Sequence, residues 1–172
     1  GFRQRFVESV EARLAGGGGI GALLSGGLDS SSIVSAAARS RIADKDFRLR
    51  TFSFSYPKSL AFDEREYVDA VLSEYPLAPT FVDMDGVSPV DGLAGLIDGR
   101  DDLFFSPGIP KIAKVLGAAR AAGVTAMLDG HGGDEVASHG FGRLRELAQQ
   151  GQWLSLYREL RGVSSIFGES PL

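Results

Sequence analysis

The chain has no cysteine among its 172 residues. This absence excludes disulfide bonds, thiolate metal sites and a cysteine nucleophile. The sequence also lacks any apolar run approaching the roughly 20 residues of a membrane-spanning helix, and it has no signal-peptide pattern. Together these absences predict a cytoplasmic protein that has no membrane partner.

Clustered positive charge is scarce as well. The chain has 18 Lys and Arg against 22 Asp and Glu, a net charge of −4, and its basic residues are scattered apart from a modest run between residues 39 and 50. Because nucleic-acid binding depends on a concentrated basic surface, we expect no nucleic-acid partner.

Hydrophobic residues, by contrast, make up 44% of the chain. That share is ample for one hydrophobic core, and we expect a single domain over residues 1–172. The chain begins at Gly1 without a methionine and enters a helical pattern almost at once. This start indicates a fragment of a longer protein, so that part of the active site would lie elsewhere.

The chain is organised around the segment Ile20–Val34, in which a short apolar run meets a glycine pair and continues as a helix. Ile20–Leu24 is typical of a strand that is buried on both faces of a sheet. Gly26 and Gly27 allow the backbone to turn sharply and allow a phosphate to approach the N–H groups at the helix N-terminus. The segment therefore predicts a strand, an anion-binding turn and a helix.

Asp29 distinguishes this turn from a Walker loop. A Walker loop ends in Gly-Lys-Ser or Gly-Lys-Thr, whereas here Gly27 is followed by Leu28 and Asp29. An aspartate would repel a polyphosphate unless a divalent cation stood between them, so Asp29 predicts Mg²⁺. The alternative is an ordinary α/β protein in which Ser25 or Asp29 caps the helix.

Strand and helix patterns alternate along the rest of the chain. We expect helices at about 2–14, 28–41, 63–75, 90–97 and 107–122. We expect strands at about 20–24, 49–54, 80–84 and 124–128. Two prolines, Pro76 and Pro79, are expected to end the third helix.

This alternation predicts an α/β fold with a doubly wound parallel sheet and helices on both faces. If the first three strands run outward in order and the fourth returns beside the first, the strand order is 3-2-1-4. The topological switch point then lies between strands one and four, where ligands bind at the carboxyl ends. The loops at 25–30 and 129–134 would meet there.

The second glycine-rich loop lies within Met127–Glu135, directly after the last expected strand. If Asp134 reaches the same crevice as Asp29, it supplies a second carboxylate for a magnesium ion. The alternative is that Asp134 and Glu135 cap the next helix.

His131 stands between Gly130 and Gly132 in this loop. A histidine can accept a proton near neutral pH, which suits a residue that positions or deprotonates an attacking amine. The alternative is a loop histidine held by a hydrogen bond.

Four segments of the chain resemble the synthetase domain of the asparagine synthetase family. They are Ser25–Ser30, Thr51–Phe54, Phe62–Glu64 and Leu128–Glu135, in the order and at about the spacing of the family. The first segment also resembles the pyrophosphate loop of the N-type ATP pyrophosphatases, which release AMP from ATP. The resemblance runs from Phe2 to about Arg161 and implies an adenine nucleotide alpha hydrolase-like fold.

The resemblance implies an ATP-dependent amide-forming ligase that uses Mg²⁺. It would adenylate a small-molecule or peptide carboxylate, which ammonia or an amine then attacks. By this resemblance the nucleotide pocket includes Leu23, Phe54, Asp129 and Gly130. The phosphates and metal would meet Ser25, Gly26, Gly27, Asp29, Ser30 and Asp134, with Asp29 and Asp134 as metal ligands. The expected catalytic residues are His131 and Asp134.

The chain departs from asparagine synthetases proper at His131, where they usually carry glutamate. This loop and the tail Gly142–Arg161 look more like the related cyclases of peptide natural products, including lasso peptide cyclases. One alternative is therefore a lasso peptide or β-lactam-type cyclase, in which the nucleophile is a substrate amine. NAD and GMP synthetases and tRNA-modifying ligases share the first loop, and the second loop distinguishes the chain from them.

Two parts of the family pattern are not found in this chain. The glutaminase domain with its N-terminal cysteine would lie outside it. The catalytic lysine of the family is also not identified. The residues that flank the lysines of this chain do not match those around the catalytic lysine of the family; these lysines are Lys45, Lys58, Lys111 and Lys114. A second alternative is therefore a catalytically incomplete nucleotide-binding domain.

Overall fold

The computed structural model describes residues 1–15, 19–41, 43–44, 47, 49–58, 63–92, 95, 106–133 and 141–167. Its residues form two compact units, Gly1–Gly130 and His131–Leu172. The single domain expected over 1–172 stays a prediction. The helix expected at 90–97 lies largely outside the described residues.

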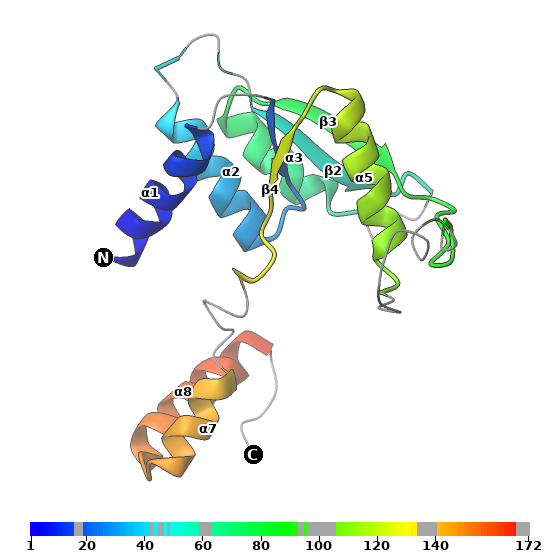
Figure 1. The fold of residues 1–172 in the computed structure, drawn as a ribbon. Coiled ribbons are helices and arrows are strands. Elements are labelled where there is room, and N and C mark those ends of the chain that lie inside the picture. Colours follow the sequence, from blue (N-terminus) through cyan, green and yellow to red (C-terminus); the bar gives the residue numbers. More distant parts are fainter. Residues whose placement is uncertain are drawn as a thin grey trace. The chain divides into compact units, whose positions relative to one another are not determined.

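The first unit contains a parallel sheet, which has four strands in the described part of the chain (Figure 1). The strands are β1 (Ile20–Leu23), β2 (Arg50–Ser55), β3 (Ala78–Asp83) and β4 (Ala126–Leu128). Their order is β3-β2-β1-β4, and every neighbouring pair is parallel. The α/β fold and the strand order 3-2-1-4 predicted from the sequence are therefore confirmed.

Helices cover both faces of this sheet, as expected (Figure 1). They are α1 (Phe2–Leu14), α2 (Leu28–Ser40), α3 (Arg65–Glu74) and α5 (Ile109–Ala121). One core cluster joins β1 to α1, α2 and α3 through residues such as Leu24, Val34 and Val68. The other cluster joins β2 and β3 to α5 through Phe52, Val82 and Val115, so a separate core lies on each side of the sheet.

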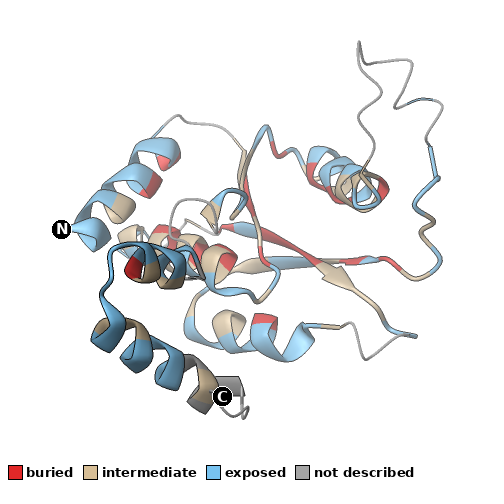
Figure 2. Ribbon diagram, turned by 90° about the horizontal axis from the view of Figure 1, so that it is seen from below, coloured by how far each residue is buried: buried red, intermediate tan, exposed pale blue. Residues whose placement is uncertain are grey.

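Successive residues of β1 point into different cores, which is why the strand reads as continuously apolar. Ala22 and Leu24 are fully buried in the cluster with α2, whereas Leu23 packs against the cluster with α5. The buried residues of the sheet lie mainly on its two central strands, β1 and β2 (Figure 2). Burial on both faces of β1 is therefore confirmed.

The expected role of Pro79 is wrong. Helix α3 ends at Glu74, and Pro79 lies inside β3 opposite Thr51 of β2. Because β3 is the edge strand of this sheet, a residue without an N–H donor is tolerated there. The third strand therefore begins at Ala78, two residues before its expected start.

The second unit contains two described helices, α7 (Phe141–Gln149) and α8 (Trp153–Phe167). Leu147 of α7 is fully buried, and Gly151, with a φ of 68°, lies in the turn between the helices. In neither unit is any described helix both long enough and apolar enough to cross a membrane.

Candidate functional site

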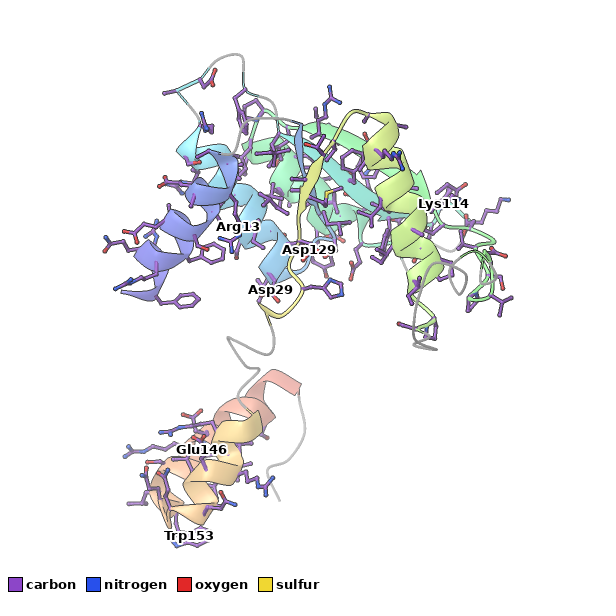
Figure 3. All side chains as sticks on the ribbon, in the orientation of Figure 1. Arg13, Asp29, Lys114, Asp129, Glu146 and Trp153 are labelled. Carbon is purple, nitrogen blue, oxygen red and sulfur yellow. The ribbon has the colours of Figure 1, made fainter. Side chains whose placement is uncertain are left out.

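The carboxyl ends of the parallel strands place two glycine-rich loops at one edge of the sheet. Residues 25–27 connect β1 to α2, and Asp129 and Gly130 follow β4, which is the other neighbour of β1. Figure 3 shows Asp29, in the first turn of α2, and Asp129 at this same edge. The crossover order of the strands, rather than proximity in sequence, brings these two carboxylates to one place.

Gly26 gives the first loop its sharp turn. Its φ is +89°, a left-handed conformation that side chains rarely adopt. A Cβ at this position would lie 2.7 Å from Cβ of Tyr67 and 3.3 Å from the carbonyl oxygen of Glu64. The loop therefore packs directly against the start of α3, and both its conformation and its surroundings require glycine.

Two serines hold the first loop in shape. The main-chain N–H of Ser25 donates to Oγ of Ser30 over 3.2 Å, and the two Oγ atoms are 3.0 Å apart. Ser30 Oγ also donates to the carbonyl oxygen of Gly27 over 3.2 Å, and the N–H of Gly27 donates to Oγ of Ser25 over 3.3 Å. The hydroxyl groups thus fix the loop before any ligand is bound.

The N-terminus of α2 has no side-chain cap, because its N-cap residue is Gly27. Asp29 is half-buried, and its carboxylate forms no hydrogen bond or ion pair with the other described residues. The alternative in which Asp29 caps the helix is therefore wrong, because no described side chain makes a capping hydrogen bond there. The first N–H groups of a helix lack partners within the helix, and its dipole attracts an anion to them.

The second loop contacts the first at Gly130. A Cβ at Gly130 would lie 2.9 Å from Cβ of Asp29 and 3.1 Å from the main-chain nitrogen of Ser30. Both distances are shorter than ordinary van der Waals contact, so the two loops approach each other as closely as glycine permits. Gly130 thus brings the chain after β4 against the start of α2, which the switch-point argument predicted.

The described contact between the loops does not test two of the predicted residues. His131 belongs to the second unit, where it is exposed. Asp134 lies outside the described residues. No group of three or more potential metal-binding side chains occurs among the residues that the structure describes. The metal roles of Asp29 and Asp134 therefore stay predictions.

Half-buried apolar side chains line the α5 face of the same edge. Leu23 of β1 and Phe54 of β2 both pack against the core cluster under α5, together with Tyr56 and Met127. The register of the sheet pairs Leu23 with Phe52, which places Phe54 two residues further along β2. The two apolar residues predicted for the nucleotide pocket therefore lie on one face, at the ends of neighbouring strands.

Sequence reasoning missed the contacts of Tyr67 and Lys111. Tyr67 belongs to an apolar stripe on α3, and no local pattern shows that its Cβ abuts the first loop. The sequence gives no sign that Nζ of Lys111 donates to Oη of Tyr56, over 3.0 Å. Both contacts join elements that are distant in sequence, so only the fold could reveal them.

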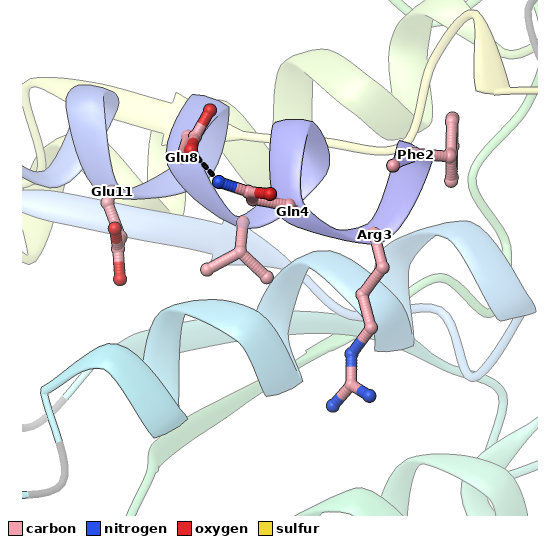
Figure 4. A pocket seen from close by; sticks show the side chains of 7 residues that line it. Phe2, Arg3, Gln4, Glu8 and Glu11 are labelled. Carbon is pink, nitrogen blue, oxygen red and sulfur yellow. Dashed lines mark hydrogen bonds between the residues drawn. The ribbon is translucent and has the colours of Figure 1, made fainter.

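Two surface hollows in the described structure lie away from these loops. One, of about 620 Å³, follows α1 and is lined by Gly1, Phe2, Arg3, Gln4, Val7, Glu8 and Glu11 (Figure 4). The other, of about 480 Å³, lies beside α5 and is lined by Val87, Asp91, Gly92, Gly95, Pro110, Ala113 and Lys114. Neither of these two hollows includes a predicted site residue.

The chain matches a known protein family over most of its length. The family model described as asparagine synthase matches residues 1–165, which include both loops and all the strands. None of the curated proteins compared with the chain matches it. The segments that carry the sequence resemblance thus fall within a match to one family over nearly the whole chain.

Proposed function

Because the chain belongs to the asparagine synthase family, we propose that it is the synthetase part of an enzyme that adenylates a carboxylate and forms an amide. The family consists of ATP-dependent ligases, so the coarse activity follows from membership. The finer proposal is that ATP is cleaved to AMP and pyrophosphate, and that the nucleophile is ammonia or a substrate amine.

One observation carries this proposal, namely the close contact of Gly130 with Asp29 and Ser30. It joins the loop after β4 to the anion-binding turn after β1, at the switch point where α/β folds bind ligands. A capped helix in an ordinary α/β protein needs no such contact. An enzyme that must hold a triphosphate and a reacting carboxylate together needs two loops at one edge.

The proposed chemistry has two steps. An oxygen of the substrate carboxylate attacks the α-phosphorus of ATP, and the bond to the bridging oxygen breaks so that pyrophosphate leaves with the electron pair. The amine nitrogen then attacks the acyl carbon, the bond to the AMP oxygen breaks, and the nitrogen loses a proton. The protein contributes mainly by holding the reactants in place and by neutralising developing charge.

The residues of the first loop fit a magnesium-bound polyphosphate. Asp29 presents a carboxylate, the ligand type that Mg²⁺ prefers, beside the uncapped start of α2. Bound Mg²⁺ would neutralise charge on the departing pyrophosphate. In the proposal the phosphates lie against Ser25, Gly26, Gly27 and Ser30, and Asp134 supplies a second carboxylate to the metal.

The base and ribose would lie at the same edge of the sheet, on the face that α5 covers. In the proposal they contact Leu23 and Phe54, with Asp129 and Gly130 closing the pocket from the loop after β4. The half-buried state of Leu23 and Phe54 supports this assignment, since a partly exposed apolar surface suits a flat aromatic base.

The test is the substitution Asp29→Asn in the longest available form of the protein. A neutral amide is a poor magnesium ligand, so we expect Mg²⁺-dependent binding of ATP to weaken by about tenfold or more, and AMP formation with candidate carboxylates to be abolished. Calorimetry with and without Mg²⁺ measures the first, and chromatography of the nucleotide products measures the second.

The matched control is Asp69→Asn on α3, which removes an exposed carboxylate that pairs with Arg65. This variant should bind Mg²⁺-ATP as the unchanged protein does. Formation of ADP and orthophosphate, instead of AMP and pyrophosphate, would contradict the proposed function, because cleavage would then occur at the γ-phosphate. Equal binding by the two variants would remove Asp29 from the metal site.

A further inference from the structure

A charged side chain of α5 contacts the apolar face of the sheet at Tyr56. Lys111 lies in the first turn of α5 and is half-buried. Its Nζ is 3.0 Å from Oη of Tyr56 and 5.0 Å from the centroid of the tyrosine ring. Tyr56 immediately follows β2, two residues after Phe54. A cation is therefore held at the end of β2 on the α5 face of the sheet, against which Leu23 and Phe54 also pack.

Tyr56 is itself fixed in position by its main chain. Its N–H donates to Oδ2 of Asp63 over 3.1 Å, and Oδ1 of the same carboxylate accepts from the N–H of Arg65 over 3.0 Å. Asp63 thus ties the end of β2 to the start of α3. The side chain of Tyr56 also packs against the core cluster under α5, and its hydroxyl accepts a hydrogen bond from the ammonium group of Lys111.

The positive charge of Lys111 is not balanced by a carboxylate in the described part of the chain. Its described contacts are the hydroxyl and the ring of Tyr56, and neither carries a formal charge. An ammonium group has three N–H donors, and Tyr56 engages only one of them. The remaining donors suit an acceptor on a ligand that lies on the apolar surface.

We propose that Lys111, held by Tyr56, recognises the base of the nucleotide by donating a hydrogen bond to a ring nitrogen of a purine. This inference rests on the proposed function, since it assigns a residue to the same nucleotide pocket. Ring nitrogens of purines are acceptors without hydrogen, and a hydrogen bond from a charged donor is stronger than one between neutral groups. Leu23 and Phe54 supply the apolar contact.

Lys114, a second lysine of α5, has a structural contact instead of a place beside Tyr56. It lies three residues further along α5 (Figure 3), and its Nζ donates to the main-chain oxygen of Asp83 over 2.6 Å. Asp83 ends β3, the edge strand, which is separated from β1 by β2. Lys114 therefore fastens α5 to the sheet away from the switch point and provides a matched control.

The test compares ligands with and without a base, in the longest available form of the protein. The probes are Mg²⁺-ATP and Mg²⁺ with inorganic tripolyphosphate, both measured by calorimetry or by competition. We expect Lys111→Met to weaken ATP binding by about tenfold and to leave tripolyphosphate binding unchanged. Lys114→Met should change neither, and Lys111→Arg, which keeps a charged donor, should recover part of the ATP affinity.

The outcomes separate this inference from the proposed function. If the unchanged protein binds ATP and Lys111→Met binds it equally well, the inference is overturned and the proposed function stands. If Lys111→Met melts normally but loses both ligands equally, Lys111 acts on the phosphates rather than on the base, which also overturns the inference. If the unchanged protein does not bind Mg²⁺-ATP at all, the proposed function itself fails.

Discussion

Gly26 and Gly130 serve the two loops for different physical reasons. Gly26 has a positive φ, so a side chain there would be strained even in open space. Gly130 has no positive φ, and what excludes a side chain is the backbone and Cβ of Asp29 and Ser30. The sequence shows where the two glycines occur, and the structure shows the different reason why each position excludes a side chain.

Gly130→Ala tests the contact between the loops. The new Cβ would lie 2.9 Å from Cβ of Asp29, so one loop must shift. We expect the free energy of unfolding to fall by about 1–3 kcal/mol, as for other overpacked sites, and the affinity for Mg²⁺-ATP to fall as well. Urea unfolding and calorimetry measure the two effects.

Gly117→Ala is the matched control, because a Cβ at Gly117 meets no atom within 4 Å in the interior of α5. This variant should gain about 0.5–1 kcal/mol, since alanine favours helix more than glycine does. If Gly130→Ala behaves like Gly117→Ala, the close approach of the two loops is contradicted.

At the scale of elements, β2 has two different faces. Phe52 and Phe54 point toward α5, so the alternating residues Thr51 and Ser53 point toward the core that contains α2 and α3. Thr51 is fully buried and Ser53 is 2% exposed, and neither hydroxyl has a hydrogen-bond partner among the described residues. Polar and apolar residues alternate along β2 in the sequence, yet the strand is buried on both faces.

Thr51→Val should stabilise the protein. Valine has nearly the same shape and removes a buried hydroxyl whose desolvation is not compensated by a described partner. We expect the free energy of unfolding to rise by about 1 kcal/mol. Thr80→Val on the exposed edge strand is the control and should change it by less than about 0.5 kcal/mol. A loss of stability in Thr51→Val would mean that a bound water or ligand satisfies the hydroxyl.

At the scale of the whole molecule, the second glycine-rich loop crosses the boundary between the two units. Asp129 and Gly130 belong to the first unit, and His131 begins the second. The family match nevertheless continues to residue 165, so it extends over the first unit and most of the second. We propose that the first unit binds the nucleotide and that His131 acts in the second step, where the attacking amine must lose a proton.

His131→Ala tests this division of roles in the longest available form of the protein. Formation of the acyl-adenylate should survive, whereas transfer to the amine should slow by about a hundredfold or more, as is typical when a general base is lost. Rapid-quench measurement of the two half-reactions separates these effects. Equal loss in both steps would make His131 a structural support of the loop, and no loss in either would exclude it from the reaction.

Much of the fold followed from local patterns in the sequence. The apolar run at Ile20–Leu24, the glycine pair after it and the alternating strand and helix patterns predict a parallel sheet, because right-handed crossovers leave few arrangements. The prediction for Pro79 is wrong because a proline that ends a helix and a proline on an edge strand cannot be distinguished from the sequence alone. Only the position of β3 at the edge of the sheet distinguishes them.

The sequence by itself predicted the fold class and the two loops from residues that are neighbours in the chain. It predicted the strand order 3-2-1-4 from the alternation of strands and helices together with the rule of right-handed crossovers. Tertiary structure decided which side chains share the edge of the sheet. The contact of Gly130 with Asp29, of Tyr67 with Gly26 and of Lys111 with Tyr56 each joins residues at least 40 positions apart. Such contacts depend on how helices pack on the sheet, and no local periodicity encodes that packing.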